Sequence, residues 1–125
     1  MKNKEKYLEL KKRLLKYRSA MERVQRLRLR MDENRRGDDM EELKRRAERQ
    51  EQRAIEYMND LEGMLNLLEE GKRREVLELY FRNGLSHEEI AEQNSYTERH
   101  VKRLFSEGMY ALLTLEKLSN TAIDV

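Results

Sequence analysis

Hydrophobic residues recur in the first half of the chain at alternating spacings of three and four. One run extends from Tyr7 to Met31, and a second extends from Met40 to Leu68. This spacing places apolar side chains on one side of an α-helix and is typical of coiled-coil seams. The intervening segment 34–39 contains Asn, Gly and Asp, which favour turns. The pattern therefore predicts two long helices joined by a turn.

The two runs match each other when the chain folds back at this turn. Large residues then face small ones in several layers, an arrangement that suits close packing. Arg13 would lie near Asp60, and Arg18 near Glu51. We therefore expect an antiparallel helical hairpin over residues 1–70. The expected layers pair Met31 with Met40, Arg28 with Leu43, Val24 with Ala47, Met21 with Gln50, Tyr17 with Ala54, Leu14 with Tyr57, Leu10 with Leu61, and Tyr7 with Met64.

The pattern changes in the second half, where two short helical segments follow one another. Ser86 with Glu89 forms the signature of a capping box, which predicts one helix start. Thr97 supplies a second N-cap after the polar break 94–96. A small residue at Ala91 allows two helices to cross closely. The positions expected to face inward are apolar, and they are Ile90, Ala91, Val101 and Leu104. Residues 71–125 are therefore expected to form a helix-turn-helix module, which makes the whole chain all-α.

The exposed face of the second short helix is basic. Arginine, lysine and histidine side chains there can donate hydrogen bonds to base edges and phosphates. We expect this face to bind double-stranded DNA, although such a helix pair could also simply close a small all-α domain. The candidate DNA-binding residues are Ser86, His87, Thr97, Glu98, Arg99, His100, Lys102, Arg103 and Ser106.

Two neighbouring stretches carry a recognisable motif, RREVLELYF at 73–81 and GLSHEEIA at 84–91. They resemble region 4 of the sigma-70 family, which implies contact with the −35 promoter element and with the flap of RNA polymerase. The similarity is greatest to small region 4-like proteins of phages and mobile elements in Gram-positive bacteria, with regulators of the ArpU and RinA type as neighbours. In that group, a run like the one at 96–101 opens the recognition helix. The resemblance covers roughly residues 72–118.

Two residues of the turn depart from that family's pattern. Asn94 stands where an apolar residue is common, and Ser95 stands where glycine is common. Asparagine tolerates the left-handed backbone conformation that such a turn needs. We therefore expect a variant of the turn within an unchanged fold.

Charge is distributed unevenly along the chain, although the net charge is +2. Residues 1–36 hold 14 Lys/Arg against 5 Asp/Glu, a net charge of +9, and residues 37–70 hold 5 against 11, a net charge of −6. Residues 71–125 hold 8 against 9, so that the expected DNA-binding module is near neutral and should bind with modest affinity. The basic first helix could contact nucleic acid directly, but matching by its acidic neighbour is the favoured interpretation.

Composition argues against several functional classes. The chain has no cysteine and no proline, and 42% of its residues are charged. It shows neither the apolar run of a signal peptide nor a stretch long enough to span a membrane, which suggests a cytoplasmic protein without membrane contact. We find no phosphate-binding loop or nucleophile motif. His87 and His100 lack companion ligands. We expect no enzymatic activity, no metal site and no cofactor.

The hairpin has more apolar surface than one seam can bury. The extra residues could dock the helix-turn-helix or pair two chains, so a homodimer is one expectation. These residues are Leu8, Leu15, Ile55, Met58, Leu65 and Leu67. The favoured function is a transcriptional regulator that acts on phage or mobile-element promoters, either alone or together with RNA polymerase. The alternative is a structural or DNA-packaging protein, similar to a small terminase subunit, whose hairpin forms oligomers.

Overall fold

The structure, a computed structural model, describes the backbone of residues 2–33, 37 and 39–123, and the side chains of 3–33, 37 and 39–118. Within these residues all regular secondary structure is α-helical, and there is no strand. The helices are α1 (Lys2–Glu33), α2 (Met40–Leu65), α3 (Lys72–Phe81), α4 (His87–Asn94) and α5 (Glu98–Ile123). The all-α prediction is confirmed. None of the described helices is both long and apolar enough to cross a membrane.

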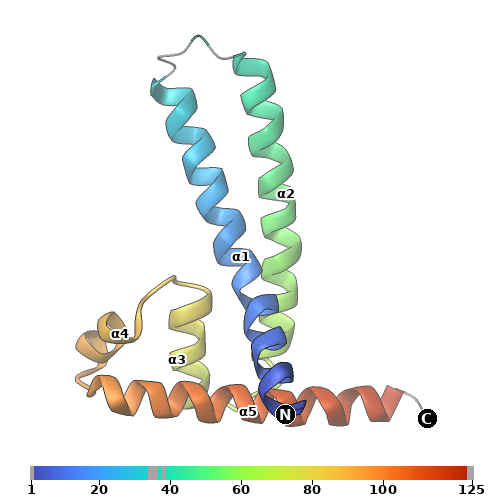
Figure 1. Ribbon diagram of the computed structural model, residues 1–125, viewed down its shortest axis with the longest axis vertical. Helices are drawn as coiled ribbons and strands as arrows, with labels where there is room; N and C mark the ends of the chain where they lie inside the picture. The colour runs from blue at the N-terminus through green and yellow to red at the C-terminus, as the bar shows by residue number, and fades with distance from the viewer. Residues whose placement is uncertain (1, 34–36, 38, 124–125) are drawn as a thin grey trace.

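Helices α1 and α2 form the predicted antiparallel hairpin, which rises from the rest of the molecule (Figure 1). The predicted seam accounts for most of the buried residues along it, because the three-four spacing keeps these side chains between the two helices. Ala20 is also buried, although the predicted seam did not include it. The buried seam residues are Leu10, Leu14 and Val24 on α1, and Leu43, Ala47, Ala54, Leu61, Met64 and Leu68 on α2 and the segment after it.

Two details of the predicted hairpin are wrong. Arg28 does not occupy a seam layer, since its side chain is exposed and forms an ion pair with Glu51. Arg18 therefore does not pair with Glu51, and its guanidinium lies 5.4 Å from the Tyr80 ring centroid instead. A long side chain can reach past its nearest neighbour, so seam register alone does not decide its partner. The predicted turn at 34–39 lies largely outside the described residues. Asp39 caps α2 by accepting hydrogen bonds from the backbone N–H groups of residues 41 and 42.

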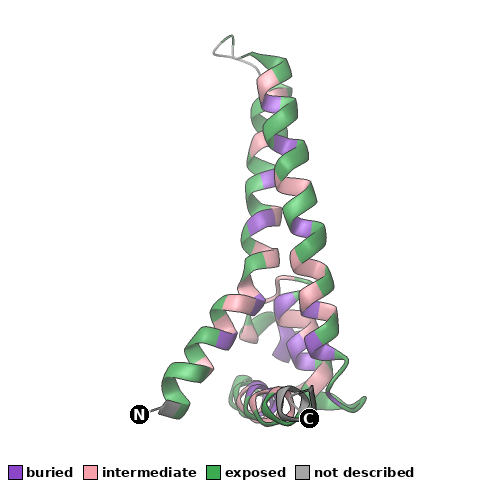
Figure 2. Ribbon diagram, turned by 90° about the vertical axis from the view of Figure 1, so that its right-hand side faces the viewer, coloured by how far each residue is buried: buried purple, intermediate pink, exposed green. Residues whose placement is uncertain are grey.

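One hydrophobic core connects the base of the hairpin with α3, α4 and α5. Leu65 is fully buried in this core, and Leu15 and Met58 pack against it. These three off-seam residues therefore dock the hairpin onto the other helices, which was one of the two expected roles. Leu8, Ile55 and Leu67 remain exposed. Buried positions gather where the hairpin meets α3, α4 and α5 (Figure 2).

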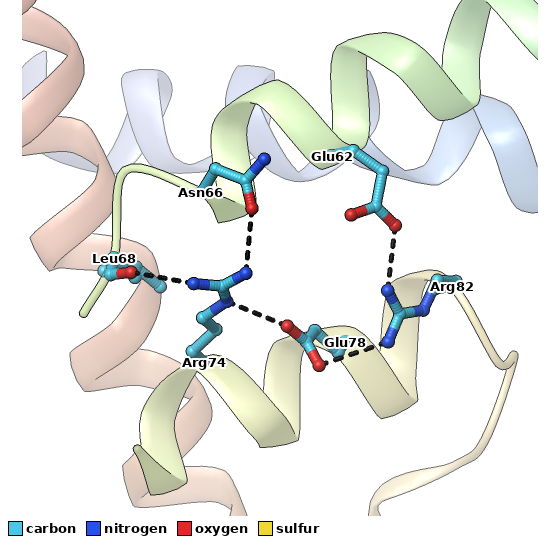
Figure 3. Close-up of polar contacts among 6 residues, drawn as sticks. All are labelled: Glu62, Asn66, Leu68, Arg74, Glu78 and Arg82. Atoms are coloured by element: carbon cyan, nitrogen blue, oxygen red, sulfur yellow. Dashed lines mark hydrogen bonds and ion pairs between the residues drawn. The ribbon is translucent and has the colours of Figure 1, made fainter. Parts of the chain in front are cut away.

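A polar network fixes α3 against the end of α2 (Figure 3). Arg74 donates hydrogen bonds to the side chains of Asn66 and Glu78 and to the backbone oxygen of Leu68, at 2.8, 2.9 and 3.3 Å. Glu78 also accepts from Arg82, which in turn donates to Glu62 at 2.9 Å. The carboxylates of Glu62 and Glu78 raise the pKa of Arg82 above its ordinary value. Charge-assisted bonds of this kind give orientation as well as energy.

Arg13 of α1 connects its own helix to α2 and α5. It forms two hydrogen bonds with Asp60 of α2, at 2.5 and 2.8 Å, and one with Glu116 of α5, at 2.6 Å. The predicted proximity of Arg13 and Asp60 is thus confirmed. The bond from Arg13 holds the pKa of Asp60 below its ordinary value. Because these side chains are more than a third exposed, water screens the pair, and its main effect is to set orientation.

Candidate nucleic-acid interface

Helices α4 and α5 begin at the two caps that the sequence predicts. The Ser86 hydroxyl accepts a hydrogen bond from the Glu89 backbone N–H, and the Glu89 carboxylate accepts one from the Ser86 N–H, so the capping box is complete. These bonds lower the pKa of Glu89. Thr97 Oγ1 accepts from the His100 backbone N–H at 3.1 Å and caps α5. Each cap satisfies a backbone donor that the helix start would otherwise leave unpaired.

The turn between the two helices depends on one residue in the left-handed conformation. That residue is Ser95, with φ 56° and ψ 37°, whereas Asn94 is the last residue of α4. The Tyr96 N–H donates to the Ala91 carbonyl at 2.9 Å, and the Ser95 N–H donates to the Glu92 carbonyl, as in a Schellman motif. The turn is thus a variant, as expected, but its left-handed residue is Ser95 and not Asn94, although asparagine tolerates this conformation. The Asn94 side chain instead donates to the Ile90 carbonyl at 2.9 Å.

Helix α5 is held in place by close packing against α3. The inward residues Ile90, Ala91, Val101 and Leu104 are all buried, as the sequence predicts. At Gly108, a Cβ atom would lie 3.0 Å from Leu77 Cδ1, so the absence of a side chain allows α3 to cross α5 closely. The opposite face of the N-terminal half of α5 is thereby left toward solvent.

The structure brings three basic side chains together on this open face of α5. Arg99, Lys102 and Arg103 are all exposed, and Arg103 has a side-chain exposure of 66%. Lys102 pairs with Glu98 at 3.3 Å, while Arg103 lies 3.9 Å from Glu107. Arg99 has no ion pair or hydrogen bond with the part of the chain that the structure describes. The face therefore presents cations that are free or held by exposed, easily exchanged partners.

The remaining predicted residues on α5 flank these cations. Glu98 and Thr97 are exposed at the helix start, and Ser106 is half-buried one turn beyond Arg103. The His100 ring meets Tyr96 edge-on at 4.9 Å, and its Nδ1 lies 2.9 Å from an Arg103 nitrogen. Ser86 is exposed, but its hydroxyl is used by the cap. The structure thus places Thr97, Glu98, His100 and Ser106 along the start of α5 with the cations, while Ser86 lies at the start of α4. The role of all five in binding stays a prediction.

His87 has a different position from the other candidates. Its ring stacks on Tyr80 and meets Phe105 edge-on, with centroids 5.0 and 4.9 Å apart. Burial lowers the pKa of His87, and the nearby charges of Lys11 and Lys102 lower it further. The structure gives this ring a packing role, although the charge of Lys102 on the basic face still acts on it. Its DNA contact stays a prediction.

Two further basic residues lie beside the predicted face. The Lys72 ammonium is 5.8 Å from the ring centroid of Tyr96 in the turn, and Arg73 pairs with Glu107 of α5 at 2.9 Å. Both come from the start of α3, and sequence reasoning did not include them. The basic run at 72–74 was a signal that could have identified them, but the sequence did not show that α3 begins next to α5.

A metal-based function finds no support in the described side chains. They contain no group of three or more His, Asp or Glu residues placed to hold a metal ion. His87 and His100 each pack against aromatic rings instead.

The comparisons with known proteins agree with this geometry. The family model "Sigma-70, region 4" matches residues 70–112, which include α3, the α4–α5 helix-turn-helix and the basic face of α5. Comparison with curated proteins and with solved structures gave no match. The C-terminal half of the chain therefore carries a sigma-70 region 4-like helix-turn-helix module, which supports a DNA-binding regulatory function.

Proposed function

We propose that this protein is a sequence-specific DNA-binding transcriptional regulator without enzymatic activity. Its helix-turn-helix, within residues 71–125, would place the N-terminal half of α5 in the major groove, and the hairpin of residues 1–70 would support it. The observation that carries this proposal is the exposed set of Arg99, Lys102 and Arg103 on a helix matched by the sigma-70 region 4 family. In helix-turn-helix proteins the start of the second helix contacts base edges.

The geometry of α5 divides the proposed contacts into two kinds. Arg99 is the best candidate for reading a base, because it lies in the first turn and has no partner among the described residues. Lys102 and Arg103, with Lys72 and Arg73 beside them, suit phosphates, where contacts position the protein without reading sequence. The near-neutral module offers few such contacts, so one copy should bind with modest affinity.

Two finer features are part of the proposal. By resemblance, the target would be a promoter of a phage or mobile element, and RNA polymerase would supply part of the affinity. A homodimer would also raise the affinity for DNA, because it would hold two modules at a fixed spacing. The structure leaves less apolar surface for such pairing than the sequence suggested, because Leu15, Met58 and Leu65 are used in docking the hairpin. Sedimentation equilibrium with and without the target DNA distinguishes the dimer from the monomer.

The test begins with selection of a preferred duplex from a random DNA pool. Arg99→Ala should weaken binding to the selected site by about 1–3 kcal/mol if Arg99 forms a bidentate contact with guanine. Binding to random DNA should change much less. Lys44→Ala is the matched control, since Lys44 is an exposed basic residue of the hairpin, away from α5.

Other patterns of lost DNA affinity would change or exclude this assignment. An equal loss on selected and random DNA would make Arg99 a phosphate contact. Failure of the pool to yield any preferred sequence would contradict sequence-specific binding. Full binding by a variant with Arg99, Lys102 and Arg103 all changed to alanine would exclude α5 as the DNA-binding element.

A further inference from the structure

A groove lined by arginine runs between α1 and α2 in the outer half of the hairpin. It has a volume of about 610 Å³. We call it the arginine groove and define it by Arg23, Arg26 and Arg30 of α1 and Arg46, Arg49 and Arg53 of α2. The hairpin carries it away from α5 and the helix-turn-helix (Figure 1). These arginines do not belong to the apolar seam between α1 and α2, and they are not part of the helix-turn-helix module.

The arrangement of the six side chains follows from helix geometry. On each helix they are spaced by three and then four residues, so they occupy one face and rise by about 4.5–6 Å from one to the next. The helices run antiparallel, and the two rows of arginine line one groove. Arginine side chains therefore make up six of the eight residues that line the groove, with Leu27 and Gln50 as the other two.

This arrangement is unfavourable for the hairpin alone. Arg49 and Arg53, for example, are like charges at a spacing where they repel. Arg23, Arg26, Arg46 and Arg53 form no ion pair or hydrogen bond with the described part of the chain, whereas Arg49 lies 3.6 Å from Glu42. The floor includes Gln50, whose amide oxygen is buried without a hydrogen-bond partner among the described residues. An anion in the groove would offset this repulsion.

The chemistry of the groove selects the kind of anion. Guanidinium groups bind phosphate with two parallel hydrogen bonds, and two rows of them suit a ligand with regularly repeated charges. Among the described residues that line the groove, Leu27 is the sole apolar side chain, and none is aromatic. Interfaces between proteins are enriched in aromatic residues, so this lining is unlike a protein-binding surface. We propose that the arginine groove binds the phosphodiester backbone of a nucleic acid, as a second contact separate from the helix-turn-helix.

The second contact would add to the first without reading sequence. A nucleic acid held by α5 would present its neighbouring phosphates to the hairpin at high effective concentration. These phosphates would belong to the region that flanks the site bound by α5, or to a second nucleic-acid molecule bound at the same time. The outer hairpin would then supply phosphate contacts that the near-neutral module lacks. This inference goes beyond the proposed promoter recognition, because it assigns a binding site to the hairpin.

The test uses the full chain with Arg26, Arg46 and Arg53 changed to glutamine, which retains good helix propensity. The matched control removes three charges outside the groove, as Lys4→Gln, Lys12→Gln and Lys44→Gln. Both sets are made in the wild-type chain and in the Arg99→Ala, Lys102→Ala, Arg103→Ala background, which separates the groove from the helix-turn-helix. Affinity for a random-sequence DNA duplex, and for a single-stranded RNA of equal length, is measured across a salt series.

The groove variant should bind the DNA duplex roughly tenfold more weakly at low salt, and its salt slope should fall by about 2–3, which corresponds to about 0.9 for each lost phosphate contact. The control should change affinity less than twofold. A loss confined to RNA would also support the proposal and identify RNA as the ligand. Equal losses in groove and control variants would overturn it, since net charge alone would then explain binding. Unchanged affinity for both nucleic acids would also overturn it and point to an acidic protein partner.

Discussion

The imidazole ring of His87 stacks on the phenol ring of Tyr80, with the ring centroids 5.0 Å apart and the planes inclined by 18°. Phe105 meets both rings edge-on at 4.9 Å. One histidine thus connects α3, α4 and α5 through aromatic contacts. Its Nδ1 is buried and has no hydrogen-bond partner among the described residues. The stability of the module should therefore depend on whether this ring carries a proton.

The pKa of His87 is lowered, first by burial and then by Lys11 and Lys102. The folded state therefore favours the neutral ring, and the unfolded chain binds more protons as the pH falls. The contribution of His87 to stability is complete above its unfolded pKa of about 6.5 and is lost as the pH drops below that value. We expect the melting temperature to decline from about pH 7 to pH 5.

His87→Phe tests this origin of the pH dependence. Phenylalanine retains the ring contacts with Tyr80 and Phe105 but cannot be protonated. Thermal unfolding followed by circular dichroism should show a flatter profile between about pH 7 and 5 than in the wild-type protein. Asp60 and Glu89 have lowered pKa values, so their losses belong to a more acidic range and should remain in the variant. An unaltered decline in His87→Phe would assign the effect to other groups.

Gly108 and Gly63 offer a matched pair of helical glycines. At Gly108 a Cβ atom would lie 3.0 Å from Leu77 Cδ1 and 3.4 Å from the Arg73 backbone oxygen, whereas at Gly63 nothing lies within 4 Å. Gly63→Ala should stabilise the protein by about 0.5–1 kcal/mol through helix propensity. Gly108→Leu should destabilise it by about 1–3 kcal/mol or more, because the side chain forces α3 away from α5. Chemical denaturation measures both, and stabilisation by Gly108→Leu would contradict this helix crossing.

Ser95 is strained by its left-handed conformation, which L-residues adopt at a cost of roughly 1–2 kcal/mol. Ser95→Gly should therefore raise the free energy of unfolding by up to about 1 kcal/mol, since glycine adopts this conformation freely but also gains entropy in the unfolded chain. Ser95→Val should lower it, because a β-branched residue fits the conformation poorly. A gain in stability for the valine variant would show that the turn has another geometry. Urea denaturation provides the comparison.

The seam of the hairpin can be tested with three leucines. Leu14 and Leu61 each have 1% exposure, while Leu29 is 57% exposed on the same hairpin. Leu14→Ala and Leu61→Ala should each lower the free energy of unfolding by about 2–5 kcal/mol, because each leaves a cavity in the core. Leu29→Ala should cost less than about 0.5 kcal/mol, as is usual at exposed sites. Similar losses at all three positions, measured by chemical denaturation, would be inconsistent with this seam.

The sequence by itself determined the two helices of the hairpin and the places where α4 and α5 begin, whereas the length of α5 exceeds the short segment that was expected. The three-four spacing of apolar residues predicted both arms of the hairpin, and Ser86, Glu89 and Thr97 predicted the starts of α4 and α5. Such signals are local, because a cap or a seam position depends on residues a few places away. For the same reason the basic face of α5, with Arg99, Lys102 and Arg103, could be predicted before the fold was known.

Tertiary structure decided how these elements meet and which partner each long side chain takes. It turned the His87 ring toward Tyr80, directed Arg18 to the same ring instead of Glu51, and chose Ser95 as the left-handed residue of the turn. It also aligned two rows of arginine across the hairpin, which lie far apart in the sequence. The reason is physical: the partner of a long or aromatic side chain depends on packing between elements that are distant along the chain, and no local pattern encodes that packing.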